Sequence, residues 1–284
     1  GGADFGGGVW DLLATGPRAR AQRRLIEHAI APVWEANHVW LIVLVVILFT
    51  GFPPAFAVIS TALHIPLTLV LLGIVLRGSA FVFRQYGAPP GGAPEQDASG
   101  SRGAEADSFA GPSDDPARPA SVLRRTHHTV DDQTALRWGR VFAVASVVTP
   151  VFLGVSLGAV TGEGIRVERG VPTTGFVRPW LGAFPFSVGL LALSAFAFLA
   201  ATYLTREAEH VEGPEGAALR DDFRRRALVA GAATAACAVL AAVLARGAAP
   251  RFFAALTGAT PVMLGGALLL AGALVALWRG AFGW

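Results

Sequence analysis

Glu35, Asn37 and His38 place a carboxylate, an amide and an imidazole within one turn of an otherwise apolar segment. Residues three apart share a helix face, so Glu35 and His38 would point the same way. Such groups are costly against lipid and are expected to face protein or a water-filled cavity. The pattern predicts a pair that handles protons. Two alternatives remain: both groups are solvated near the headgroups, and the flanking Trp34 and Trp40 form only an interfacial aromatic belt.

The next apolar segment carries a polar stripe at helical spacing, formed by Ser60, Thr61, His64 and Thr68. For the three hydroxyl residues we favour hydrogen bonding between helices. A histidine near the middle of the membrane could instead relay protons or bind haem iron. Haem binding would require a second ligand such as His38 at the same depth. The sequence therefore disfavours a haem in this chain, and it predicts no bound metal.

Arg77 interrupts an apolar run that resumes after it. It either ends a membrane span and extends to the headgroups, or it lies inside the protein opposite an acid such as Glu35 or Asp4. Asp4 stands in a glycine-rich phrase at residues 1–8, as a residue at a helix end or as a second acid of a proton pathway. The phrase lacks the Lys-Ser/Thr of a phosphate-binding loop, so nucleotide binding is not supported.

The elements that must position these residues are membrane helices. Hydrophobic residues make up 53% of the chain and charged residues 15%, against about 25% charged residues in soluble domains. A spanning helix needs about 20 mostly apolar residues. Such stretches predict an all-α, polytopic transmembrane bundle with spans at 31–52, 55–75, 138–160, 180–204, 227–244 and 253–278.

All 23 basic residues are arginines, and they predict the orientation of the spans. Eighteen fall in or beside alternate connections and five on the opposite side, so the arginine-rich side is expected to be cytoplasmic. The same distribution disfavours nucleic-acid binding. Residues 87–133 are rich in Gly, Pro, Ser and acids and predict a disordered cytoplasmic loop. It separates a signature region, 1–86, from four further spans within 134–284.

Several phrases resemble the signature of subunit II of cytochrome bd-type quinol oxidases. The specific resemblance covers residues 1–84, through residues 2–8, 31–41, 53–56 and 76–78, with weaker similarity at 185–190 and 201–204. In that family the first helix lies upstream of such a glycine-rich phrase, and further helices follow the last span found here. The chain is therefore expected to be a fragment.

The resemblance implies a helical subunit without haem in the bacterial inner (plasma) membrane. Its partner, subunit I, would bind haem b, in some members haem d, and oxidise quinol while oxygen is reduced to water. A small accessory subunit can join them. Glu35 stands where the family keeps an acid at the entrance of a proton path. Five further residues match signature positions: Trp34, Asn37, Trp40, Asp4 and Arg77.

Two alternatives to this function remain. A proton-coupled secondary transporter could use Glu35, His38 and Arg77 as coupling residues, and would show inverted repeats with broken helices. A self-contained b-type cytochrome would require paired histidines at matched depths.

Overall fold

The computed structural model describes residues 2–86 and 120–280, without the side chains of 31–38, 81–137 and 262. The predicted all-α architecture is confirmed. The helices are α1 (Gly2–Leu12), α2 (Ala19–Gly51), α3 (Pro53–Ala62), α4 (His64–Tyr86), α5 (Ala120–Thr161), α6 (Ala183–Glu207), α7 (Gly213–Ala248), α8 (Pro250–Gly258) and α9 (Thr260–Arg279), with a 3-10 turn, η1, at Ala208–His210. Two short strands, β1 (Val167–Glu168) and β2 (Val171–Pro172), form an antiparallel hairpin.

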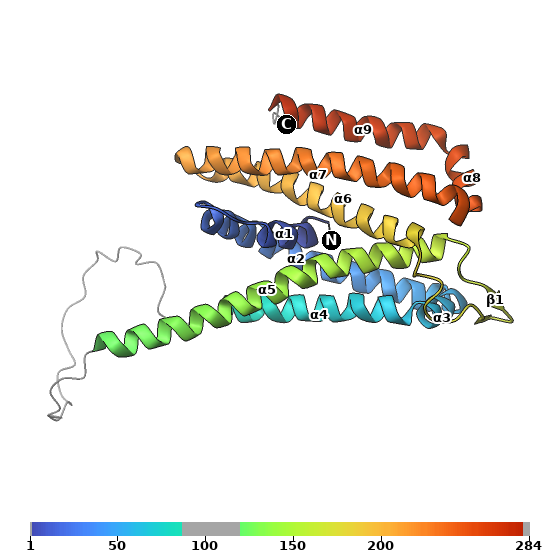
Figure 1. Ribbon diagram of the computed structural model, residues 1–284, viewed down its shortest axis with the longest axis horizontal. Helices are drawn as coiled ribbons and strands as arrows, with labels where there is room; N and C mark the ends of the chain where they lie inside the picture. The colour runs from blue at the N-terminus through green and yellow to red at the C-terminus, as the bar shows by residue number, and fades with distance from the viewer. Residues whose placement is uncertain (1, 87–119, 281–284) are drawn as a thin grey trace.

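The long helices lie side by side along the longest dimension of the molecule (Figure 1). Three described helical segments are long and apolar enough to cross a membrane: Trp138–Thr161, Ala183–His210 and Gly213–Ala248. The number rises to five if each of two bent helix pairs counts as one span. A shorter apolar stretch occupies His64–Ala80 of α4.

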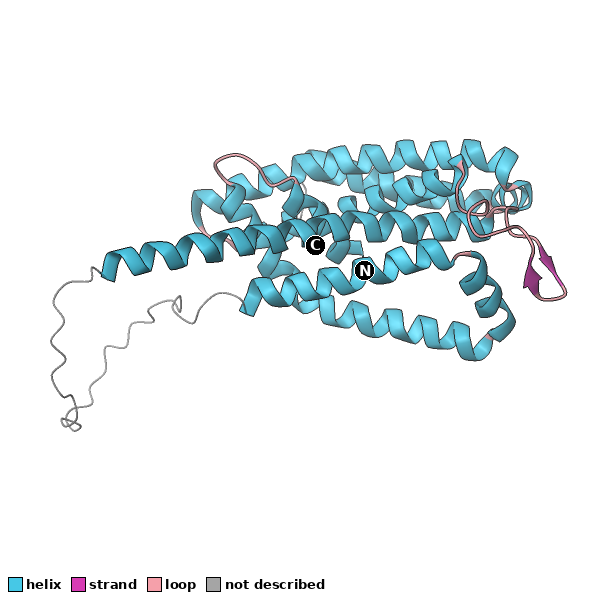
Figure 2. Ribbon diagram, turned by 60° about the horizontal axis from the view of Figure 1, so that its bottom comes forward, coloured by secondary structure: helices cyan, strands magenta, loops and turns pink. Residues whose placement is uncertain are grey.

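The connections divide between the two ends of the bundle. The turn between α1 and α2 lies at the same end as η1 and the start of α7, whereas α3, the hairpin and α8 lie at the opposite end (Figure 1). The hairpin projects beyond the helices (magenta in Figure 2). The first of these ends, which we call the arginine-rich end, carries Arg18–Arg24 and Arg220–Arg226, and its position agrees with the predicted topology.

The predicted span at 55–75 is wrong in position, because the helix breaks at Leu63. α2 ends at Gly51, and α3 then turns away from it by 114°. α4 begins only at His64 and runs to Tyr86. Two prolines explain the break: Pro53 begins α3, and Pro66 stands in the first turn of α4, where its missing N–H does no harm. Ser60 and Thr61 therefore do not share a helix with His64.

Two other predicted boundaries shift. The span at 253–278 is divided into α8 and α9, which meet at 77° just before Pro261. α5 already begins at Ala120, where the sequence predicted loop to residue 133. The segment 120–133 contains neither Gly nor Pro, so the downstream helix can extend through it. Residues 87–119, the rest of that predicted loop, lie outside the described residues.

α1 is wedged between α2, α5 and α6 and depends on close backbone contact. A Cβ atom on Gly6 would lie 1.9 Å from the carbonyl oxygen of Phe196 in α6, and one on Gly8 would lie 2.1 Å from Ser146 Oγ in α5. Small residues allow membrane helices to approach in this way. The end of α1 is fixed by Trp10, whose Nε1 donates a hydrogen bond to the Ala197 carbonyl at 2.8 Å.

Candidate functional site: a buried ion pair between α1 and α4

Asp4 and Arg77 form an ion pair in the interior of the bundle. Each side chain is 1% exposed. Arg77 Nη2 donates to Asp4 Oδ1 and, at 2.8 Å, to the main-chain oxygen of Asp4. The prediction that Arg77 lies inside the protein opposite an acid is confirmed, with Asp4 as the acid. The alternative, an arginine extending to the headgroups, is wrong.

Two aromatic rings flank the guanidinium. Its carbon lies 4.7 Å from the ring centre of Phe5 and 4.9 Å from that of Phe142 in α5. Both distances allow cation–π attraction, which is strongest where water is excluded. Arg77 Nε and Nη1 and Asp4 Oδ2 have no hydrogen-bond partner among the described residues. The site is therefore a charged pair with unused donors and one unused acceptor.

The depth of the pair follows from helix geometry. Asp4 stands eight residues before the end of α1, and Arg77 stands nine residues before the end of α4. At a rise of 1.5 Å per residue, both lie about 12–14 Å from the ends of their helices on the arginine-rich side. A hydrocarbon core is about 30 Å thick. The pair therefore lies well inside the bundle, away from the ends of both helices.

The segment with Glu35 crosses the bundle at a similar height. A Cβ on Gly7 of α1 would lie 1.8 Å from Ile30 Cδ1 of α2, and the two helices run in opposite directions (Figure 1). Three residues back from Gly7 is Asp4, and three residues on from Ile30 is residue 33. The Glu35 backbone is therefore about 3 Å from the height of Asp4 along the bundle axis.

Of the other predicted residues of α2, only Trp40 has a described side chain. The side chains of Trp34, Glu35, Asn37 and His38 lie outside the described residues. Trp40 is 72% exposed on an apolar stretch of the same helix.

His64 does not occupy the predicted position near the middle of the membrane. It is the first residue of α4, at the end of the bundle opposite the arginine-rich one. Its ring packs edge-on against Phe176, with centres 4.8 Å apart, and its Nδ1 lies 3.1 Å from the Thr61 carbonyl oxygen. The break before His64 moved it there, so its surroundings indicate a structural role.

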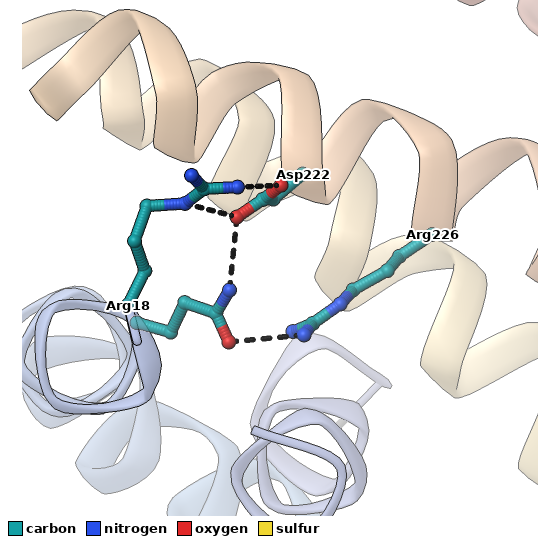
Figure 3. A network of polar contacts seen from close by, with 4 residues as sticks. Arg18, Asp222 and Arg226 are labelled. Carbon is teal, nitrogen blue, oxygen red and sulfur yellow. Dashed lines mark hydrogen bonds and ion pairs between the residues drawn. The ribbon is translucent and has the colours of Figure 1, made fainter. Parts of the chain in front are cut away.

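A second polar cluster joins the start of α2 to α7 at the arginine-rich end (Figure 3). Arg18 donates from Nε and Nη2 to Asp222 at 2.9 and 2.8 Å. Gln22 bridges the cluster: its Nε2 donates to Asp222 at 3.0 Å, and its Oε1 accepts from Arg226 Nη2 at 2.9 Å. Hydrogen bonding from Arg18 lowers the pKa of Asp222, and burial lowers that of Arg226.

Sequence reasoning treated these arginines only as topology signals and missed the cluster. Asp222 and Arg226 are four apart, which puts them on one face of α7 and could have marked a polar contact surface. Their partners, Arg18 and Gln22, are about 200 residues away in sequence. Nothing in the sequence pairs these two segments. Phe5 and Phe142, which flank Arg77, were likewise not predicted.

These features define a class: a multi-pass helical membrane protein with a charged pair buried between two of its helices. The chain belongs to the cytochrome bd terminal oxidase subunit II family, whose sequence profile matches residues 1–93 and 117–284. Members are bacterial inner-membrane proteins, so the predicted location is confirmed. Proteins of this family are subunits of an oxidoreductase complex.

Individual relatives match over shorter segments. The chain is 32% identical over 80 residues to a putative cytochrome bd menaquinol oxidase subunit II of Bacillus subtilis, covering 28% of this chain and 23% of the relative. It is 40% identical over 63 residues to a cytochrome bd ubiquinol oxidase subunit 2 of the same organism, covering 22% and 19%. The Escherichia coli K12 cytochrome bd-I ubiquinol oxidase subunit 2 is 32% identical over 80 residues, 28% of this chain and 21% of that protein. These matches span about a fifth of each relative.

The fold is similar to that of a chain in the bd oxidase of Geobacillus thermodenitrificans. The TM-score is 0.63 at 16% identity, over 98% of this chain and 70% of that one. At this identity the likeness shows the fold alone.

Proposed function

We propose that this chain is the non-haem subunit of a quinol-oxidising, oxygen-reducing terminal oxidase. It would support a haem-bearing subunit I and supply cytoplasmic protons through Glu35, with Asp4 and His38 as further members of the path. The observation that carries the proposal is the Asp4–Arg77 pair, a buried charge at the height of Glu35 in a chain of this family.

The pair suits a proton path for two reasons. Charged groups at membrane depth usually mark ion or proton pathways. Asp4 Oδ2 accepts no hydrogen bond from the described residues, so it can accept one from water or from a protonated neighbour. Arg77 would balance the charge of Asp4 and keep the path from trapping a proton. The haems, held by the partner, would supply the electron transfer to oxygen.

The partner would contact the second half of α2. From Val39 to Phe49 apolar side chains are exposed in nearly every direction around the helix, among them Trp40, Leu44 and Phe49 at 72%, 64% and 58%. A helix that is apolar all round is covered by lipid or by protein. We place subunit I along this stretch, with lipid on the rest of the bundle surface.

The test is Glu35→Gln in the intact complex, with Glu35→Asp as the matched control that keeps the acid. We expect Glu35→Gln to slow quinol-driven oxygen consumption by about a hundredfold, the usual scale for loss of a proton-transferring group. Glu35→Asp should retain most of the activity. Unchanged turnover and unchanged re-oxidation of the haems in Glu35→Gln would overturn the proton-path role.

A proton-coupled secondary transporter remains the second candidate because two bent helix pairs occur among the described residues. Transporters place such breaks near the middle of the membrane, where substrate binds. Here α3 and α8 both lie at one end of the bundle (Figure 1). This position favours the oxidase. Proton-driven uptake of a solute by vesicles that contain this chain without subunit I would favour the transporter over the oxidase.

A further inference from the structure

A groove of about 450 Å³ opens at the arginine-rich end, between the first turns of α2 and the start of α7. Its basic walls come from Arg18, Arg20, Arg24 and His28, and Glu215 is the acid among its lining residues. The groove is therefore electropositive. It is separate from the Asp4–Arg77 pair and has no part in the proposed proton path.

Two of these arginines are available to an outside ligand. Arg18 is engaged by Asp222. Arg20 and Arg24 are exposed, and neither forms an ion pair or hydrogen bond with another residue that the structure describes. They are four residues apart, so their guanidinium groups share one face of α2. Such a pair presents a double fork of donors suited to the oxygens of a phosphate.

The groove also has an apolar floor. Leu25 and Leu219 line it and are 7% and 2% exposed. His28 stands three residues, about 4.5 Å, before the first apolar span predicted at residue 31. The groove thus lies just on the cytoplasmic side of that predicted span, where lipid headgroups are expected. A soluble anion such as phosphate has no apolar part that could contact these leucines, whereas a lipid has one.

We propose that the groove binds the headgroup of an anionic phospholipid. Arg20 and Arg24 would contact the phosphodiester, while Leu25, the lining leucine nearer to the predicted span, would contact the glycerol. Basic pockets between membrane helices on the cytoplasmic side are suited to such lipids. The site would hold α2 and α7 together beside the Arg18–Asp222 contact.

The test uses the assembly purified from its own membrane through a tag on this chain and then delipidated in detergent. Native mass spectrometry would count bound lipid during titration with phosphatidylglycerol or with phosphatidylcholine of the same acyl chains. The variant is Arg20→Gln with Arg24→Gln. Its matched control is Arg206→Gln with Arg220→Gln, two exposed arginines at the same end that do not line the groove. Arg20→Lys with Arg24→Lys keeps the charge without the forked donors, should fold as the wild type does, and should bind more tightly than the glutamine variant and more weakly than the wild type.

We expect the groove variant to raise the apparent Kd for phosphatidylglycerol by about tenfold or more, and the control to change it less than twofold. Phosphatidylcholine should bind all forms equally. Equal loss in variant and control would show unspecific charge attraction and overturn the proposal, and so would wild-type affinity in the variant. Displacement of the lipid by millimolar inorganic phosphate would overturn it in favour of a soluble phosphate site.

Discussion

Asp4 and Arg77, 73 residues apart in sequence, meet in the interior of the bundle and join α1 to α4. Removing two charges from water is costly, and the attraction between them offsets that cost only when the geometry is good. The pair therefore specifies how α1 and α4 are placed more than it adds to stability.

Removal of one partner of the pair should be far worse than removal of both. We expect Asp4→Ala or Arg77→Ala to destabilise the assembly by about 3–5 kcal/mol, because each leaves an uncompensated buried charge. The double variant Asp4→Leu with Arg77→Met should lose markedly less. Thermal inactivation of the purified assembly measures both. If each single variant is as stable as the double variant, the pair is not a coupled unit.

Gly6→Ala should weaken the docking of α1. The new methyl group would meet a main-chain oxygen, which cannot move aside as a side chain can, and overpacking of this kind costs about 1–3 kcal/mol. Gly265→Ala in α9 is the control, since its Cβ would meet no atom within 4 Å and alanine favours the helix. The melting temperature should fall in the first variant and hold or rise in the second. An unchanged value for Gly6→Ala would show that α1 is loosely held.

The contact between Arg18 and Asp222 should be insensitive to pH across the physiological range. Arg18 lowers the pKa of Asp222 in the folded protein. The ionised Asp222 therefore stabilises the fold at any pH above the ordinary aspartate pKa, and this stabilisation is lost only as the pH falls through the lowered pKa of Asp222. At pH 7, Asp222→Asn should cost about 1 kcal/mol or less, since Arg18 is half exposed. Melting temperatures of variant and wild type should differ by the same amount at pH 6 and pH 8. A difference that shrinks between these values would show that Asp222 titrates higher than proposed.

His64→Phe should leave quinol-driven oxygen consumption unchanged. The histidine packs against Phe176 at the end opposite the arginine-rich one, and a phenylalanine can keep the edge-on ring contact. Oxygen consumption and melting temperature would both be recorded. Loss of activity without loss of stability would contradict a structural role and indicate that His64 takes part in the function.

The sequence predicted the helical class and the alternation of the spans, because both rest on local composition. It left an enclosed Arg77 as one of two alternatives. The sequence misplaced His64, because residues 55–75 are mostly apolar and hydropathy does not detect the helix breaks beside Pro53 and Pro66. It could not pair Arg18 with Asp222, because contact between residues about 200 apart depends on packing that no local pattern encodes. The sequence named Glu35 and Asp4 as possible partners of Arg77, and only the packing of α1 against α4 shows the contact with Asp4.

The uncovered second half of α2 has a consequence for the life of the protein in the cell. A chain that inserts before it meets the proposed partner would hold this helix with little support, and proteases cleave segments that open locally. We therefore expect the amount of this chain to follow the amount of its partner, with any excess degraded soon after synthesis. The bare helix would then make the ratio of the two subunits self-correcting.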